Sequence, residues 1–196
     1  GPGIVGAFGA GAKPSVQMTG GTSILNLSSA TTPGIGDWRV MDLDLDGMSA
    51  SGTIGINADG GIRQFLALRV NTHDIMRGIF FGTSILDWFN SDGNPTHSGH
   101  VIYDDVAVVD SIGTGCATGC GDWRVFLAGT RGTIQGNSLD NMSIGGSHVI
   151  RSGYMGRGII SNNDIVRPGM AAIKLHAQKW TVDSVANPGA VGTYTE

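Results

Sequence analysis

The sequence is poor in charged and aromatic residues, which make up 14% and 7% of its 196 residues. It also lacks any stretch of useful length in which apolar residues recur at the spacing of an amphipathic helix. Residues 170–179 come nearest to one, and they read equally well as a strand. No apolar run approaches the roughly 18 residues that span a membrane, and no signal peptide is recognisable. These absences argue against a helical protein, and we expect no membrane span.

Basic residues are too few to indicate a nucleic-acid-binding protein. The formal net charge is −4, and Lys and Arg form no cluster that would attract a phosphate backbone. We therefore expect no nucleic-acid partner.

Glycine is abundant, with 33 residues, and it accompanies a repeated pattern of short apolar segments. In each copy, two apolar residues five positions apart enclose a polar or β-branched middle, and a turn follows. The copies are Val40 to Leu45, Phe65 to Val70, Tyr103 to Val108, Ile134 to Leu139 and Ile160 to Ile165. Their last residues are 25, 38, 31 and 26 positions apart, as in a solenoid with loop insertions.

A second series of apolar segments lies between these copies. Its members are Ile24 to Leu27, Ile54 to Ile56, Ile79 to Phe80, Phe126 to Leu127, Val149 to Ile150 and Ile173 to Leu175. Two interleaved series predict an all-β fold for residues 1–196, a single right-handed parallel β-helix with coils of roughly 24–26 residues and two parallel sheets. The long step from Phe80 to Phe126 places a large insertion in residues 82–100 and a smaller one in residues 112–121.

The predicted core follows from both series. It contains Ile24, Val40, Leu45, Ile54, Ile56, Phe65, Val70, Val108, Ile134, Leu139, Ile160 and Ile165. The pattern opens and stops in mid-repeat, so we expect coils or caps to be missing at one or both ends. Exposed terminal coils would allow self-association.

Residues 4–14 read IVGAFGAGAKP, a strand followed by a glycine-rich phrase. This phrase resembles the "GAYGSGAKP" phrase of bacterial right-handed β-helix proteins in the pectate-lyase-like, or polysaccharide-lyase-like, superfamily. Segments 149–151, 159–165 and 174–176 look like later coils of the same group. The resemblance implies a carbohydrate-active protein, secreted, cell-surface or periplasmic, that acts on acidic polysaccharide by β-elimination.

A lyase of this kind needs a base, a cation that neutralises the uronate carboxylate, and an acid for the leaving oxygen. The expected catalytic residues are Lys174, His176, Arg151 and Tyr154. Arg151 and Lys174 are 23 positions apart, so they should stack on one face at about 4.8 Å. Alternation sends Lys174 and His176 outward and Ile173 and Leu175 inward.

The expected substrate-binding residues are Arg157, Arg124, Trp123 and Trp88. Trp123 and Arg124 belong to the phrase GDWRV at residues 121–125, which also occurs at residues 36–40. An aromatic ring beside a guanidinium suits a sugar and its carboxylate. The alternative is a corner at which the tryptophan caps the apolar interior. Trp88 lies in the long insertion, which either walls a substrate groove or covers a neighbouring surface.

Residues 42–47 read DLDLDG, which matches the opening of a calcium loop with Asp42, Asp44 and Asp46 as ligands. The twelfth position of such a loop is Thr53 rather than Glu, and the strict alternation favours a solvated strand face. We expect no other cofactor.

Asn137 and Asn163 occupy the same place in successive copies, where stacked amides can hydrogen-bond from coil to coil. Leu43, Leu68 and Val106 hold that place in the earlier copies.

Cys116 and Cys120 are the only cysteines. In an exported protein they could form a disulfide, and free thiols or half of a metal site are the alternatives.

Two other functions remain open. A structural or binding β-helix, such as an adhesin, fibre or tailspike-like domain, would need none of this chemistry. A hydrolase would need paired carboxylates, for which Asp104 with Asp105 or Asp87 with Asp92 could be offered. Convergence of cations and aromatic rings from three or more successive coils would favour the carbohydrate-active reading.

Overall fold

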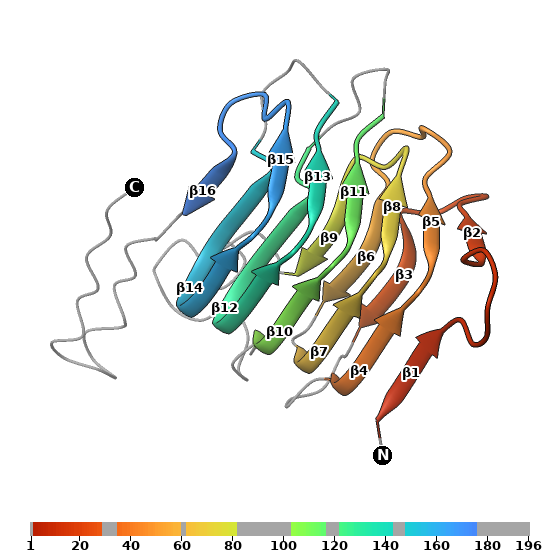
Figure 1. Ribbon diagram of the computed structural model, residues 1–196, viewed down its shortest axis with the longest axis horizontal. Coiled ribbons are helices and arrows are strands. Elements are labelled where there is room, and N and C mark those ends of the chain that lie inside the picture. Colours follow the sequence, from red (N-terminus) through yellow and green to blue (C-terminus); the bar gives the residue numbers. More distant parts are fainter. Residues whose placement is uncertain are drawn as a thin grey trace, which may run out of the picture.

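The computed structural model describes residues 2–28, 35–59, 62–81, 103–116, 122–142 and 148–175. All pairs between its strands are parallel, and the strands stack as a solenoid with about 27 residues per turn (Figure 1). Within these ranges the chain forms no helix, so none is available to cross a membrane. The predicted all-β parallel solenoid is confirmed, with a turn slightly longer than the expected 24–26 residues.

The strands form three faces rather than the two predicted. Face A contains β1 (Gly3–Gly6), β4 (Ile35–Met41), β7 (Ile62–Leu68), β10 (Tyr103–Val109) and the later parts of β12 (Val125–Gln135) and β14 (Ile150–Ser161). Face B contains β2 (Ser15–Gln17), β5 (Asp44–Asp46), β8 (Asn71–His73), β11 (Ile112–Thr114), β13 (Ser138–Asp140) and β15 (Asp164–Val166). Face C contains β3 (Ser23–Ser28), β6 (Ile54–Asp59), β9 (Arg77–Phe81), the first parts of β12 and β14, and β16 (Ile173–Leu175).

Faces A and C are joined where β12 and β14 run from one to the other. The first residues of β12 pair with β9 and its last residues pair with β10. The pairing of β12 with β14 shifts register between Leu127 and Ala128, at the corner between the two faces. The second apolar series of the sequence corresponds to the strands of face C.

The solenoid interior holds one continuous apolar core. Phe65 and Phe81 meet edge-to-face at its centre, with ring centroids 4.6 Å apart. Of the predicted core residues, Ile24, Ile160 and Ile165 are partly buried against this core, and the others are buried. The predicted core is therefore confirmed.

The sequence pattern predicted the wrong residue equivalences between the middle copies of the repeat. In the structure Val40 pairs with Ala67, Ala67 with Val108, Val108 with Ile134, and Ile134 with Ile160. Phe65 pairs with Trp38, two positions earlier in the strand. On face B the inward residue is Leu45 in β5, Thr72 in β8 and Gly113 in β11. Ala67, Thr72 and Gly113 are small or polar, so the apolar pattern pointed to larger neighbouring residues instead.

The corner between faces A and B has a left-handed residue in successive turns. These residues are Asp42, Arg69, Asp110, Gly136 and Asn162, with φ between 48° and 71°. A Cβ on Gly136 would lie 2.3 Å from Asp110 Oδ1, so this position also needs the absence of a side chain.

Inside the coil, polar side chains at the same corner form a ladder of hydrogen bonds that joins successive turns. Asn137 Nδ2 donates to Asn163 Oδ1 at 2.8 Å and to Val108 O at 3.1 Å, while Asn137 Oδ1 accepts from Ser111 N at 2.9 Å. The predicted amide ladder is confirmed. Ser111 and Val70, rather than Val106 and Leu68, hold the equivalent place in the earlier turns, since each directly precedes a face B strand.

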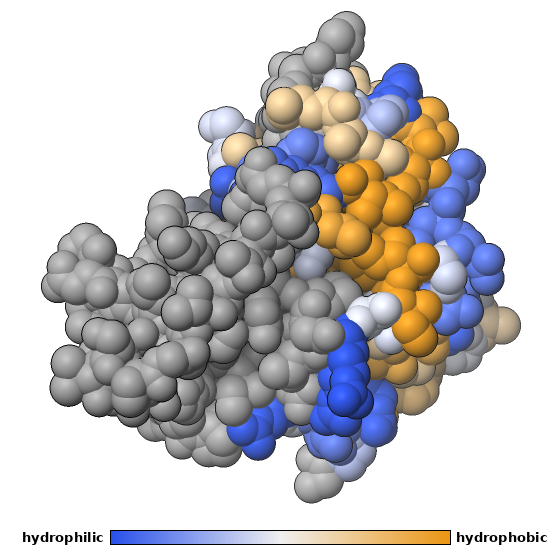
Figure 2. Space-filling model, turned by 90° about the vertical axis from the view of Figure 1, so that its left-hand side faces the viewer, coloured by the Kyte–Doolittle hydropathy of each residue, from blue (hydrophilic) through white to orange (hydrophobic). Residues whose placement is uncertain are grey.

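The C-terminal end of the stack presents apolar surface. Figure 2 looks onto this end and shows a broad apolar band on the described part of the chain. The exposed large apolar side chains of this region are Ile159, Val166, Met170, Ile173 and Leu175.

Candidate functional site

The outward-pointing residues of face C form a column whose chemistry changes along the solenoid. From the N-terminal side its members are Asn26, Asn57, Phe80, Phe126, Arg151 and Lys174, each in register with the next. The two amides hydrogen-bond to each other at 3.0 Å. Two aromatic rings follow, and the last two members are cations. Because the strands are parallel and in register, neighbouring members are about 4.8 Å apart along the axis.

Aromatic rings and guanidinium groups gather around the middle of this column. We call Arg77, Phe80, Trp123, Phe126, Arg151 and Lys174 the aromatic–cation patch. The Trp123 ring lies 5.7 Å from that of Phe80 and 5.1 Å from that of Phe126, between centroids. Arg77 Cζ is 4.9 Å from the Trp123 centroid, and Arg151 Cζ is 5.0 Å from it. Side chains from β9, β14 and β16 and from the residues just before β12 therefore contribute to one surface, and the Phe126 ring of β12, 3% exposed, is buried beneath them.

Asp122 fixes one side of the patch. Its carboxylate accepts a hydrogen bond from Arg77 Nε at 2.7 Å, and its backbone N–H donates to Met76 O at 2.8 Å. Arg151 has no ion pair within the described ranges, and its buried Nε has no hydrogen-bond partner there. The patch thus carries more positive than negative charge in a chain whose net charge is −4.

The two GDWRV phrases have different environments. Trp38 pairs with the buried Phe65 and packs against the core, whereas Trp123 is half-buried in the patch. Trp38 therefore covers the interior, as the alternative interpretation of the phrase predicted, whereas Trp123 contributes to an outer surface. Sugar binding by Trp123 stays a prediction.

Arg124 is not on the outer surface, so its prediction as a substrate-binding residue is wrong. Its side chain is 1% exposed, and its guanidinium donates to the carbonyl oxygens of Ile75, Thr114 and Met76. Burial lowers the pKa of Arg124 to about 10. The backbone of Arg124 lies against Gly78, where a Cβ would be 2.4 Å from the Arg124 carbonyl oxygen. Arg124 therefore closes a corner of the coil from within.

The predicted catalytic residues are placed in part. Arg151 and Lys174 are paired in register, as the 23-residue spacing predicted. Ile173 pairs with the buried Ile150, yet Ile173 and Leu175 are 41% and 61% exposed because β16 is the last strand of the described stack. Tyr154 belongs to β14, but its side chain lies outside the description. His176 and Trp88 lie outside the described residues.

Arg157 is not near Arg151 in the sheet. It lies in the part of β14 that belongs to face A, in register with Arg131. The structure therefore separates Arg157 from the other predicted binding residues.

The aspartates of residues 42–46 do not form a calcium loop. Asp42 lies at the corner before β5, where its carboxylate accepts hydrogen bonds from Arg69 Nε at 2.7 Å and Nη2 at 2.8 Å. That interaction lowers the pKa of Asp42. Asp44 and Asp46 are on the outer side of β5, with Leu45 buried between them. The solvated strand face is thus the correct reading for this pair.

Sequence reasoning missed the partner of these two aspartates. His73 is in register with Asp46, and its Nε2 lies 3.2 Å from Asp44 Oδ2 and its Nδ1 3.1 Å from Asp74 Oδ2. Burial disfavours the charged imidazole, but the hydrogen bonds with Asp74 and Asp44 outweigh it and raise the pKa of His73. The 27-residue step from Asp46 to His73 is the signal that would have revealed this cluster.

Cys116 is buried and disulfide-bonded. Cys120 lies outside the described residues, so the pairing of these two cysteines stays a prediction.

No protein-family model matches this chain, and neither a curated protein nor a solved structure matches it. The parallel solenoid is what the chain shares with the pectate-lyase-like superfamily, and membership of that superfamily stays a proposal.

Proposed function

We propose that this chain is a carbohydrate-active protein that binds an acidic polysaccharide on the outer side of face C. The observation that carries this proposal is the aromatic–cation patch, in which cations and rings from successive turns meet on one surface. Guanidinium and ammonium groups pair with carboxylates or sulfates, and aromatic rings contact the apolar side of a sugar. The aromatic–cation patch runs across the strands of face C, so the polymer would lie along the solenoid axis.

Catalysis by β-elimination extends this proposal. Arg151 would neutralise the uronate carboxylate, and Lys174 would take the proton on the carbon next to it. Tyr154 or His176 would return a proton to the leaving oxygen. We place the protein outside the cytoplasm, as a secreted, cell-surface or periplasmic protein, and the disulfide-bonded Cys116 supports that location.

Binding is tested by titrating the folded chain with alginate, pectate and glycosaminoglycans and by following Trp fluorescence and heat. Arg151→Ala and Lys174→Ala should each weaken binding at least tenfold. Arg39→Ala is the matched control, because it removes the same charge from face A, where Arg39 pairs with Asp37 at 3.0 Å. Equal weakening in the control, or no binding by the parent chain, would refute a specific face C site.

Catalysis is tested separately by the absorbance of unsaturated products. The parent chain should produce them from one of these polymers, and Lys174→Ala should abolish production while circular dichroism remains unchanged. Binding without product formation would leave a polysaccharide-binding protein and exclude the lyase.

A structural β-solenoid, such as an adhesin, fibre or tailspike-like domain, is the second candidate. It is favoured by the ion pairs that join successive turns, Arg69 with Asp42 and Arg167 with Asp140, and by the apolar C-terminal end of the stack, which would support self-association. Absence of polysaccharide binding together with concentration-dependent assembly in sedimentation would select this function.

A further inference from the structure

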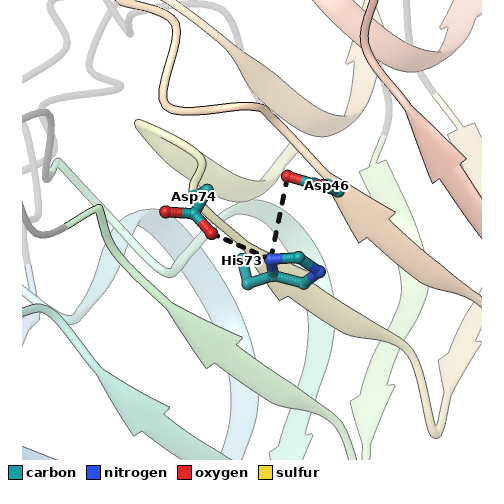
Figure 3. A group of neighbouring side chains, drawn as sticks. All are labelled: Asp46, His73 and Asp74. Atoms are coloured by element: carbon teal, nitrogen blue, oxygen red, sulfur yellow. Dashed lines mark hydrogen bonds and ion pairs between the residues drawn. The ribbon is translucent and has the colours of Figure 1, made fainter.

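Three potential metal ligands meet on face B, away from the aromatic–cation patch. Figure 3 shows Asp46 from β5 together with His73 at the end of β8 and Asp74 just after it. Asp46 and His73 are in-register neighbours, and the left-handed backbone of Asp74, with φ of 51°, follows them at the corner. One donor atom from each residue lies within 4.8 Å of the others.

The donor spacing fits one small cation. His73 Nδ1 is 3.1 Å from Asp74 Oδ2 and 3.8 Å from Asp46 Oδ1. Ligands about 2.0–2.2 Å from a tetrahedral Zn²⁺ ion are about 3.3 Å apart from one another. The Asp46 and Asp74 oxygens lie within 4.8 Å of each other, and Asp46 Oδ1 also accepts a hydrogen bond from Met48 N at 2.8 Å, so side-chain rotations would have to bring the three donors to the ion while this carboxylate oxygen uses its second lone pair.

The imidazole is held as metal-binding histidines are. Its Nε2 lies 3.2 Å from Asp44 Oδ2, so when a metal ion displaces the Nδ1 proton, donation from Nε2–H to this carboxylate would hold the ring with its Nδ1 lone pair toward Asp46 and Asp74. The other oxygen of Asp74 accepts a hydrogen bond from Ser49 Oγ at 2.9 Å, which orients the carboxylate.

The charges around His73 are unbalanced. Asp44, Asp46 and Asp74 surround a single imidazole, and no Lys or Arg in the described ranges forms an ion pair with any of the three. The nearby Lys13 ammonium donates to Asn71 Oδ1 instead. Even with a charged imidazole the cluster would keep excess negative charge, and a divalent cation is the ligand that would neutralise it.

We propose that Asp46, His73 and Asp74 bind a divalent transition-metal ion such as Zn²⁺, with Asp44 positioning the imidazole. The nitrogen ligand favours Zn²⁺ over Ca²⁺, which prefers oxygen ligands. The ion would link β5 to β8 and so clip two successive turns together. This inference is independent of the proposed polysaccharide site, because the ligands belong to face B.

The experiment is calorimetric titration of the EDTA-treated, dialysed chain with ZnCl₂, and in parallel with CaCl₂. A Zn²⁺ site that Ca²⁺ does not occupy is expected, together with a higher thermal unfolding temperature in the presence of Zn²⁺. His73→Gln and Asp46→Asn should each lower the Zn²⁺ affinity at least tenfold. Asp42→Asn and Asp140→Asn are matched controls that should leave it unchanged. Absence of Zn²⁺ binding, or unchanged affinity in His73→Gln, would overturn the proposal.

A measurement on the unsubstituted chain covers the case in which the variants do not fold. Co²⁺ added to the isotope-labelled chain should broaden or shift the amide signals of β5 and β8 and leave those of the first part of β14 unchanged. Effects confined to other parts of the chain would place the metal elsewhere and overturn the proposal.

Discussion

Arg124 shows how one residue can be placed by its backbone partners rather than by its charge. Burial of a guanidinium is costly unless its donors are used. Here Nη1 and Nη2 donate to three backbone carbonyl groups, while the buried Nε has no hydrogen-bond partner among the described residues. The role of Arg124 is to hold the coil closed.

We expect Arg124→Ala to lower the free energy of unfolding by about 3 kcal/mol or more, because it leaves buried carbonyl groups unpaired and opens a cavity. Arg39→Ala, at the matching place of the other GDWRV phrase, removes a half-buried side chain whose ion pair with Asp37 is partly solvated, and it should cost less than about 1 kcal/mol. Denaturant unfolding measures both. Similar losses in the two variants would contradict the structural role of Arg124.

The carboxylate of Asp140 provides a pH-dependent contact between turns. Its hydrogen bond and ion pair with Arg167 lower its pKa in the folded state. The unfolded chain holds its proton more readily, with a pKa near about 3.9. The contribution to stability is therefore complete above that value and is lost as the pH falls through the folded-state pKa.

Replacement of Arg167 by Gln should raise the midpoint of the Asp140 titration, as followed by the chemical shift of its carboxyl carbon. Arg39→Gln, which removes a cation from face A, should not move it. An unchanged Asp140 midpoint in Arg167→Gln would show that the ion pair does not form in solution.

At the scale of the element, the amide ladder joins three successive corners. Asn137 is 1% exposed and uses both its donor and its acceptor atoms toward neighbouring turns. We expect Asn137→Ala to lower the free energy of unfolding by about 2–3 kcal/mol, because buried hydrogen-bonding groups in both neighbouring turns lose their partner. Asn57→Ala removes an exposed hydrogen bond between two amide side chains on face C and should lower the free energy of unfolding by less than about 1 kcal/mol. Thermal unfolding of both variants compares them, and equal costs would contradict the ladder's importance.

The strands of face C could be predicted from sequence because large apolar residues mark nearly all of them. Face B was not recognised as a separate face. Its strands are only three residues long, so Leu45, Leu139 and Ile165 were assigned to the same segments as face A, and the inward Thr72 and Gly113 of the middle turns leave no apolar signal. The interior at those positions is filled by side chains from elsewhere in the chain, including Arg124. The same limit hid His73, whose relation to Asp46 appears only once the 27-residue register is known.

Part of the candidate site was predictable for a related reason. The pairing of Arg151 with Lys174 follows from a spacing of one turn without an insertion. Arg77 and Phe80 precede the segment that separates β9 from β10, so their relation to Trp123 depends on a spacing that the local turn length does not predict. Arg157 was misplaced because β14 continues around the corner from face C to face A.

For the whole molecule, the core is most complete in the middle of the stack. Val40, Phe65, Val108 and Ile134 are almost fully buried, whereas Val5, in register with Val40, and Leu175, in strands toward the two ends of the described stack, are 37% and 61% exposed. We expect amide hydrogen exchange to be slowest in β7, β10 and the later part of β12 and fastest in β1 and β16. Uniform protection along the stack would contradict a gradient and indicate that the ends are covered.

The in-register column on face C has a consequence for how this surface can change over time. Each turn contributes one side chain to this column, from amides through aromatic rings to cations, and the backbone sets the spacing between them. A point mutation therefore edits one step of the footprint and leaves its neighbours in place, while duplication or loss of a whole turn lengthens or shortens the footprint without disturbing the remaining register. If face C binds the proposed polysaccharide, the side chains that contact the polymer can therefore change one at a time while the backbone that positions them stays the same.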